Sequence, residues 1–260
     1  MDYKAQKVGN VPNLGDIYQV AAPLDQQILA FAEVGIHTLA APDEVAQVRL
    51  EGISNDYSRT SIALVRVKGA KTILVRNSFL MHPLLASAAV RAHRNGRYFE
   101  MCKDVYDEAE ARAKSQNSLA PKNRSALILS QDGDFSLTPK MPEAQFILRK
   151  QTLPYFLKFT KGKITFRNVS TDYKDNTLVN YLWFDGPRGE SDLSAGNGYL
   201  DDDDRAFGVL PVSREAGAQK FSTAPKSELY TAKNIQDALS IAGISGGVEK
   251  LIFNSLPRKS

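Results

Sequence analysis

Residues Ser61–Asn77, which read SIALVRVKGAKTILVRN, decide the fold more than any other stretch of the chain. Two runs rich in β-branched residues, Ile62–Val67 and Lys71–Arg76, flank the short turn 68–70, which contains a glycine. Two such runs joined by a short glycine-containing turn are typical of a β-hairpin. The sequence therefore predicts that an antiparallel pair of strands starts the sheet here.

A second hairpin is expected further along the chain. Tyr155–Thr160 would form its first strand, and the chain would return through the Lys161-Gly162 turn as Lys163–Arg167. Because side chains alternate across a strand, this arrangement places aromatic and aliphatic residues on one face and Lys, Thr and Arg on the other. Further strands are expected at 45–53, 126–129 and 178–184.

Helices are expected where apolar residues recur at helical spacing between start and stop signals. These segments are Leu24–Val34, a long helix from Pro83 to about Gln116, and a C-terminal helix over 232–242. The resulting class is α+β: an antiparallel sheet built on hairpins and covered by the long helix and the C-terminal helix. We expect one domain over 1–260, with an extended N-terminal arm (about 1–22) and a Gly/Asp-rich loop at 185–205.

Size and composition restrict the class of protein. The chain has 260 residues, of which 43% are hydrophobic and 24% charged, values near the average for soluble globular proteins. Its apolar runs fall far short of the roughly 20 residues that a membrane-spanning helix needs. The first residues lack the apolar core of a secretory signal, and the single cysteine cannot form an internal disulfide. We therefore expect no membrane partner and a cytoplasmic location, or one within a virion.

Charge is distributed in blocks along the chain. Residues 1–56 hold three Lys or Arg against eight Asp or Glu, and residues 57–124 hold thirteen against five. Residues 140–174 hold eight against two, and residues 185–204 hold one against seven. Such blocks suit a basic surface for a polyanion, or like subunits that dock an acidic patch on a basic one. Alternatively, the blocks interleave in the fold and cancel each other.

Sequence signatures of catalysis and of cofactor binding are absent. The chain contains no Gly-x-Ser-x-Gly nucleophile elbow, no phosphate-binding P-loop and no dinucleotide-binding glycine pattern. Its three histidines lack the spacing of a zinc site. Four consecutive carboxylates, Asp201–Asp204, could supply oxygen ligands to a divalent cation, but a solvated acidic loop or an electrostatic contact is the favoured interpretation. No cofactor or metal is expected.

The cationic residues give the most informative functional pattern, because Lys and Arg near a hairpin and a helix start could follow a phosphate backbone. An edge hairpin also carries such residues simply to resist aggregation. The candidate nucleic-acid-binding residues are Arg66, Lys68, Arg76, Arg91, Arg94, Arg97, Lys158, Lys161, Lys163 and Arg167.

Three functions follow from these patterns. The first is a non-enzymatic subunit of a multi-subunit complex that binds the backbone of single-stranded RNA or DNA. The second is a structural protomer of a viral or filamentous assembly, whose partners are copies of itself. The third is a metal-dependent nuclease that uses the Asp201–Asp204 region.

Overall fold

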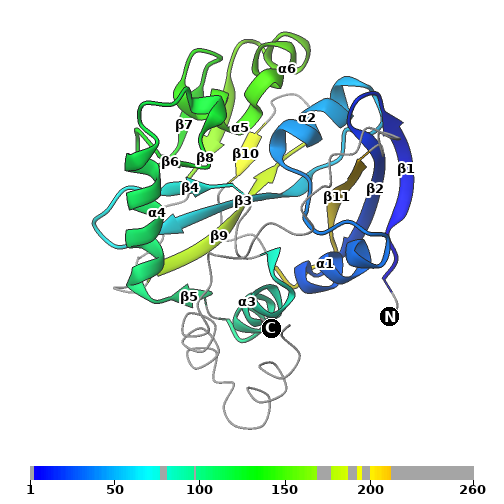
Figure 1. Cartoon of the computed structure of the whole chain (residues 1–260), viewed down its shortest axis with the longest axis horizontal. Helices are drawn as coiled ribbons and strands as arrows, with labels where there is room; N and C mark the ends of the chain where they lie inside the picture. Colours follow the sequence, from blue (N-terminus) through cyan, green and yellow to red (C-terminus); the bar gives the residue numbers. More distant parts are fainter. Residues whose placement is uncertain are drawn as a thin grey trace, which may run out of the picture.

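The structure is a computed structural model, which describes residues 3–76, 81–96, 98–168, 177–186, 192–194 and 200–211. It shows a mixed α/β protein in which one large sheet has helices on both faces (Figure 1). The sequence order of elements in the described residues is as follows: β1 (Gln6–Val11), β2 (Gly15–Ala22), α1 (Leu24–Glu33), α2 (Pro42–Leu50), β3 (Ser58–Arg66), β4 (Ile73–Val75), α3 (Pro83–Arg94), β5 (Glu100–Met101), α4 (Lys103–Ser115), η2 (Pro121–Asn123), β6 (Ala126–Ile128), β7 (Phe135–Leu137), α5 (Pro142–Leu148), η3 (Arg149–Gln151), α6 (Thr152–Phe159), β8 (Ile164–Arg167), β9 (Thr177–Phe184), β10 (Asp192–Ser194) and β11 (Asp204–Pro211). The expected C-terminal helix at 232–242 lies outside the described residues.

Strand β3 is the centre of the sheet, and all nine of its residues are buried. The main path through the sheet is β1-β2-β11-β3-β9-β10-β8-β7, with β4 and β6 added beside β3 and β5 beside β9. The expected hairpin is confirmed, because Ala63–Val65 pairs antiparallel with Ile73–Val75. Two pairings, β10 with β8 and β11 with β3, are parallel, so the sheet is mixed where we expected an antiparallel one.

Alternation along β3 divides the core between the two faces of the sheet. Ile62 and Leu64 point to a core that also holds side chains of α2, α5 and α6. Ala63 points to a core under α1 and α3, and Val65 to one under α4. This period-two partition is what a central strand covered on both sides requires. Figure 1 shows α1 and α3 together below the sheet, with α5 and α6 at the opposite edge.

The expected N-terminal arm is wrong, because these residues form two strands of the sheet, the edge strand β1 and its neighbour β2. β1 and β2 make an antiparallel hairpin, and β2 pairs along its whole length with β11, from Asp204 opposite Ala22 to Pro211 opposite Gly15. Ile17 and Ala22 are fully buried. The residues between β1 and β2 form the hairpin turn, in which Asn13 takes a positive φ of 65°. β2 therefore lies between β1 and the last described strand, β11.

The expected long helix over 83–116 is split in two. α3 ends at Arg94, and Gly96 follows with φ of 66°, the left-handed conformation that terminates many helices. The chain then forms β5 against β9 before α4 begins. Both helices cover the same face of the sheet, as expected of the single helix, but they cover different parts of it.

Two segments expected as strands are helical. Residues 45–53 lie mostly in α2, where Pro42 occupies the first turn and the Glu44 carboxylate accepts a hydrogen bond from the Ala41 backbone N–H at 2.7 Å. Residues 155–159 lie in α6, where Tyr155 and Phe156 are both buried while Leu157 is 76% exposed. The Thr160 backbone N–H donates to the Phe156 carbonyl four residues earlier, which is the hydrogen bond of a helical turn. Only the second half of the expected hairpin, β8, is a strand.

Candidate functional site

The structure separates the residues that the sequence grouped as a nucleic-acid surface. Arg66 and Arg76 are buried, at 1% and 5% exposure. Arg66 donates to Asn168 Oδ1 at 2.6 Å, and Arg76 donates to the carbonyls of Phe146 and Ile147 and to Asp43. Each guanidinium therefore already holds protein oxygens, so neither is available to a phosphate backbone.

The remaining candidates lie on different parts of the molecule. Arg91 and Arg94 are exposed on α3, which covers one face of the sheet, whereas Lys158 is exposed on α6, which covers the other. Lys68 is exposed at the turn after β3. Lys161, Lys163 and Arg167 are exposed in and beside β8, and Arg97 lies outside the described residues. The candidates that the structure describes are therefore not gathered on one surface.

Several acidic and basic blocks meet inside the molecule. Asp43 pairs with Arg76 at 2.8 Å, and Asp56 with Arg205 at 2.6 Å. On α4 the acidic residues pair with bases four positions away, as in Glu108 with Arg112. These carboxylates are thus neutralised by bases of the same chain, as expected if the charge blocks interleave in the fold. They do not form an acidic patch for docking a second subunit.

The Asp201–Asp204 run is divided among several elements. Asp201 contacts the imidazole of His93 on α3 at 3.0 Å, and Asp204 pairs with the buried Arg59 at 3.0 Å. Asp203 accepts a hydrogen bond from the Tyr3 hydroxyl at 2.8 Å. Burial raises the pKa of Asp204, while Arg59 opposes that shift. The run is an electrostatic contact that ties β11 to α3, β3 and the N-terminus, which agrees with the favoured interpretation.

A cationic groove, lined by Lys122, Lys140, Arg149 and Lys150, is the strongest candidate site. All four side chains are exposed, and within the described residues none makes an ion pair or a side-chain hydrogen bond. The groove has a volume of about 870 Å³, and Thr138, Gln145 and Leu153 complete its wall. A second hollow of about 460 Å³ shares Lys122, Arg149 and Lys150 and extends toward Asp43 and Glu44 of α2. The two hollows form one path along these cations.

Short elements hold the groove in place. Lys122 lies in η2. Arg124, just after η2, holds the loop before it, because its guanidinium donates to the carbonyls of Leu119 and Asn117 at 2.8 and 2.7 Å. Arg149 ends α5 with φ of 47°, an uncommon value for a residue with a side chain. The Thr152 hydroxyl donates to the Arg149 carbonyl at 2.6 Å, which fixes this turn. The cations are therefore presented by a defined backbone.

Arg149 also affects the charges beneath the groove. Burial lowers the pKa of Arg76, and the positive charge of Arg149 lowers it further, while Asp43 opposes both effects. Burial raises the pKa of Glu44, and Arg149 opposes that shift. The positive charge of Arg149 thus acts on the buried groups Arg76 and Glu44 beneath the groove.

Sequence reasoning missed all four groove cations as site residues. A signal was present for three of them, since Lys140, Arg149 and Lys150 belong to the basic block 140–174. Lys122 comes from a separate segment, and only the packing of η2 against α5 and η3 brings it to the groove.

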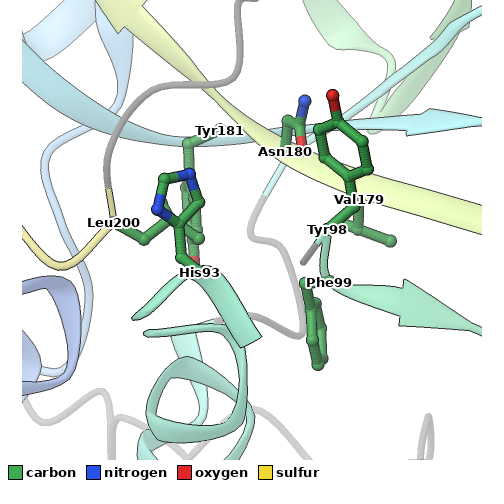
Figure 2. A pocket seen from close by; sticks show the side chains of 7 residues that line it. All are labelled: His93, Tyr98, Phe99, Val179, Asn180, Tyr181 and Leu200. Carbon is green, nitrogen blue, oxygen red and sulfur yellow. The ribbon is translucent and has the colours of Figure 1, made fainter. Parts of the chain in front are cut away.

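A separate, much smaller cavity lies between α3 and β9. His93, Tyr98, Asn180, Tyr181 and Leu200 are among the residues that line it, and Figure 2 shows the His93 ring beside Tyr181 and Leu200, with Tyr98 and Asn180 on the other side. Its volume of about 10 Å³ is room for one water molecule. Burial raises the pKa of Tyr181 well above its ordinary value, so this hydroxyl stays protonated. The cavity is too small for an organic ligand.

No helix in the described part of the chain combines the length and apolar character needed to cross a bilayer.

Comparison with known proteins identifies a fold. No family model matches the chain, and no curated protein matches it. Among solved structures, one reported as "Accommodation of massive sequence variation in Nanoarchaeota by the C-type lectin fold" is similar, with a TM-score of 0.51 and 14% sequence identity. The similarity covers 80% of this chain and 98% of that chain. At this identity the likeness concerns architecture, and the chain's fold resembles the C-type lectin fold.

Proposed function

We propose that this protein is a non-enzymatic subunit that binds the phosphate backbone of single-stranded nucleic acid in the cationic groove. The observation that supports the proposal is the gathering of Lys122, Lys140, Arg149 and Lys150 around one hollow without ion-pair partners in the described residues. Like charges placed together raise each other's energy, and a bound polyanion relieves that repulsion. Asp43 and Glu44 line only the adjoining hollow, and Asp43 is already paired with Arg76. Phosphate contacts of this kind also release counterions from the nucleic acid.

The chemistry of the groove favours binding over catalysis. The residues that line this hollow are cations, two threonines, a glutamine and apolar side chains, and none of them is a histidine, a cysteine or a carboxylate. A guanidinium such as Arg149 can hold two phosphate oxygens at once, whereas the lysines act as point charges. These groups position an anion but provide no general base.

The similar solved structure bears on the scaffold and not on the ligand. Its fold is reported to accommodate massive sequence variation. In the present chain the core clusters lie under the sheet and helices, while the groove is built from exposed side chains. A scaffold of this kind suits recognition by surface residues.

The structural-protomer alternative receives less support. It needs acidic patches that are free to meet basic patches of a neighbour, and Asp43, Asp56 and Asp204 are already paired within the chain. The nuclease alternative needs carboxylates that converge on one metal, and Asp201, Asp203 and Asp204 contact three different elements.

Charge reversal in the groove tests the proposal. We expect the triple variant Lys122→Glu, Lys140→Glu, Lys150→Glu to bind a single-stranded oligonucleotide about 100-fold more weakly at about 0.1 M salt, because three phosphate contacts are lost. The slope of log K against log salt should become shallower by about 2. Fluorescence anisotropy with RNA and DNA oligonucleotides of equal length measures both quantities, and the two arms show which backbone is preferred.

A matched variant controls for net charge. Lys68→Glu, Lys103→Glu, Lys114→Glu carries the same net charge, but its changes lie at a turn and on α4, outside the groove. We expect its affinity to change by no more than about threefold, since distant surface charges are screened. Equal losses in both triple variants, or no binding by the parent protein, would refute the groove as a nucleic-acid site.

A further inference from the structure

Helix α6 carries the two most exposed large apolar side chains of the described residues. Leu153 is 58% exposed and Leu157 is 76% exposed. They are four residues apart, so they lie on the same face of the helix. The opposite face packs Tyr155 and Phe156 into the core at 0% and 2% exposure. The helix is therefore anchored from below and presents two leucines outward.

Lysines surround this pair of leucines. Lys150 lies just before α6, Lys158 on it, and Lys161 and Lys163 in the turn that follows, and all four are exposed. The chain has no acidic residue from 144 to 168. Lys158 extends its ammonium to the Leu50 carbonyl at 2.5 Å, while Lys161 and Lys163 make no ion pair in the described part of the chain. Within the stretch 144–168 the leucines are thus accompanied by cationic and not by acidic side chains.

The turn after α6 stands clear of the rest of the protein. Gly162 takes φ of +87°, and a side chain built there would meet no atom within 4 Å. Figure 1 places α6 at the outer edge of the molecule, beyond α5. The helix and the turn that follows it therefore lie at the periphery of the molecule and are open to solvent.

We propose that α6 and the turn 160–163 are a shallow insertion point for an anionic lipid surface. Exposed leucines beside lysines are typical of segments that lie at a membrane interface, where the apolar residues enter the headgroup region and the cations meet anionic lipids. Phosphates of a nucleic acid would satisfy the lysines but would leave both leucines in water. A rigid protein partner would need pockets matched to them, whereas a bilayer needs none.

The lipid contact goes beyond the proposed nucleic-acid function. Lys150 and Leu153 also line the groove, whereas Leu157 and the lysines at 158, 161 and 163 lie outside it. The leucines are the distinguishing groups, because they contribute to burial in lipid and nothing to phosphate binding. Binding should be weak and reversible, since two leucines and a few lysines supply far less than a spanning helix. It should also weaken as salt is added.

Vesicle co-sedimentation of the full chain tests the proposal. We expect binding to phosphatidylcholine vesicles that contain about 30% phosphatidylserine, and little binding to pure phosphatidylcholine. The double variant Leu153→Ser, Leu157→Ser should lower the partition constant at least about tenfold, because both apolar insertions are lost. Lys161→Glu, Lys163→Glu should remove the preference for phosphatidylserine.

Matched controls separate insertion from general effects. Leu29 on α1 is 47% exposed, so Leu29→Ser removes an exposed leucine elsewhere and should leave vesicle binding unchanged. The single variant Leu157→Ser, which lies outside the groove lining, should weaken vesicle binding but keep the oligonucleotide affinity of the parent, which distinguishes failure of this proposal from failure of the proposed function. Equal vesicle binding by the parent and the double leucine variant would overturn the insertion, as would light scattering that shows a dimer dependent on these leucines.

Discussion

Replacing Arg49 with methionine is expected to lower the free energy of unfolding by about 3–5 kcal/mol, because the change leaves buried polar groups without partners. The Arg49 side chain is fully buried in α2. Its guanidinium donates to the Tyr155 hydroxyl at 2.9 Å and to the carbonyls of Asp56 and Phe184 at 2.8 and 2.7 Å. It also stacks on the Phe184 ring at 4.1 Å. One side chain thus joins α2, α6 and β9.

Burial lowers the pKa of Arg49, and the Tyr155 hydroxyl opposes that shift. Methionine retains much of the apolar stem but none of the donors, so three oxygens lose their hydrogen bonds at about 1–3 kcal/mol each before local relaxation. Urea unfolding followed by fluorescence of Trp183, the single tryptophan, measures the loss. The control is Arg112→Met on α4, where the lost i,i+4 pair with Glu108 should cost no more than about 0.5 kcal/mol. Similar midpoints for the two variants would contradict the assignment of Arg49 as the link.

Replacing Gly15 with alanine is expected to cost about 3 kcal/mol or more, because the new methyl group has no room and the backbone conformation is unfavourable. Gly15 begins β2 with φ of +130°. An alanine Cβ there would overlap the Leu210 carbonyl oxygen and lie 2.9 Å from Pro211 Cα, both in β11. The pairing of β2 with β11 would have to shift.

Gly69→Ala provides the comparison for this variant. Gly69 also has a positive φ, of +75°, but a Cβ there would meet nothing within 4 Å. It should therefore cost only the backbone term of about 1–2 kcal/mol. The difference between the two variants in urea unfolding isolates the contact with β11. An equal loss of unfolding free energy in both variants would mean that β2 is not packed closely against β11 at Gly15.

The central elements of the fold could be predicted from local sequence patterns. The β3–β4 hairpin, α1, β6 and β9 each combine a clear period with clear ends, and the structure confirms them. At α2 two sequence signals disagreed. Pro42 and Glu44 indicate the start of a helix, whereas the mixed pattern of apolar residues favoured a strand, and the structure has the helix.

Segment 155–159 shows why short apolar runs are ambiguous. Tyr155, Phe156, Leu157 and Phe159 suit a strand by composition, and their burial is decided by what lies beneath them. In the fold, Tyr155 packs on Phe159 and on Phe184, with ring centroids 5.0 Å apart in both cases. A helical turn brings residues 155 and 159 together, which a strand would not. Packing of Tyr155 against β9 therefore favours the helical conformation, and in that helix the Leu157 side chain is exposed.

For the candidate site, too, some features follow from the sequence and others only from the tertiary structure. By itself the sequence determined the charge of each block, the absence of acidic residues over 144–168 and the strands that carry the core, because these depend on composition and on neighbours along the chain. Only the tertiary structure decided which cations face solvent. It buried Arg66 and Arg76 on protein oxygens, placed Arg91 and Lys158 on opposite faces, and brought Lys122 to Arg149. The physical reason is that a charge is solvated or paired according to contacts across the sheet, which join residues far apart in sequence.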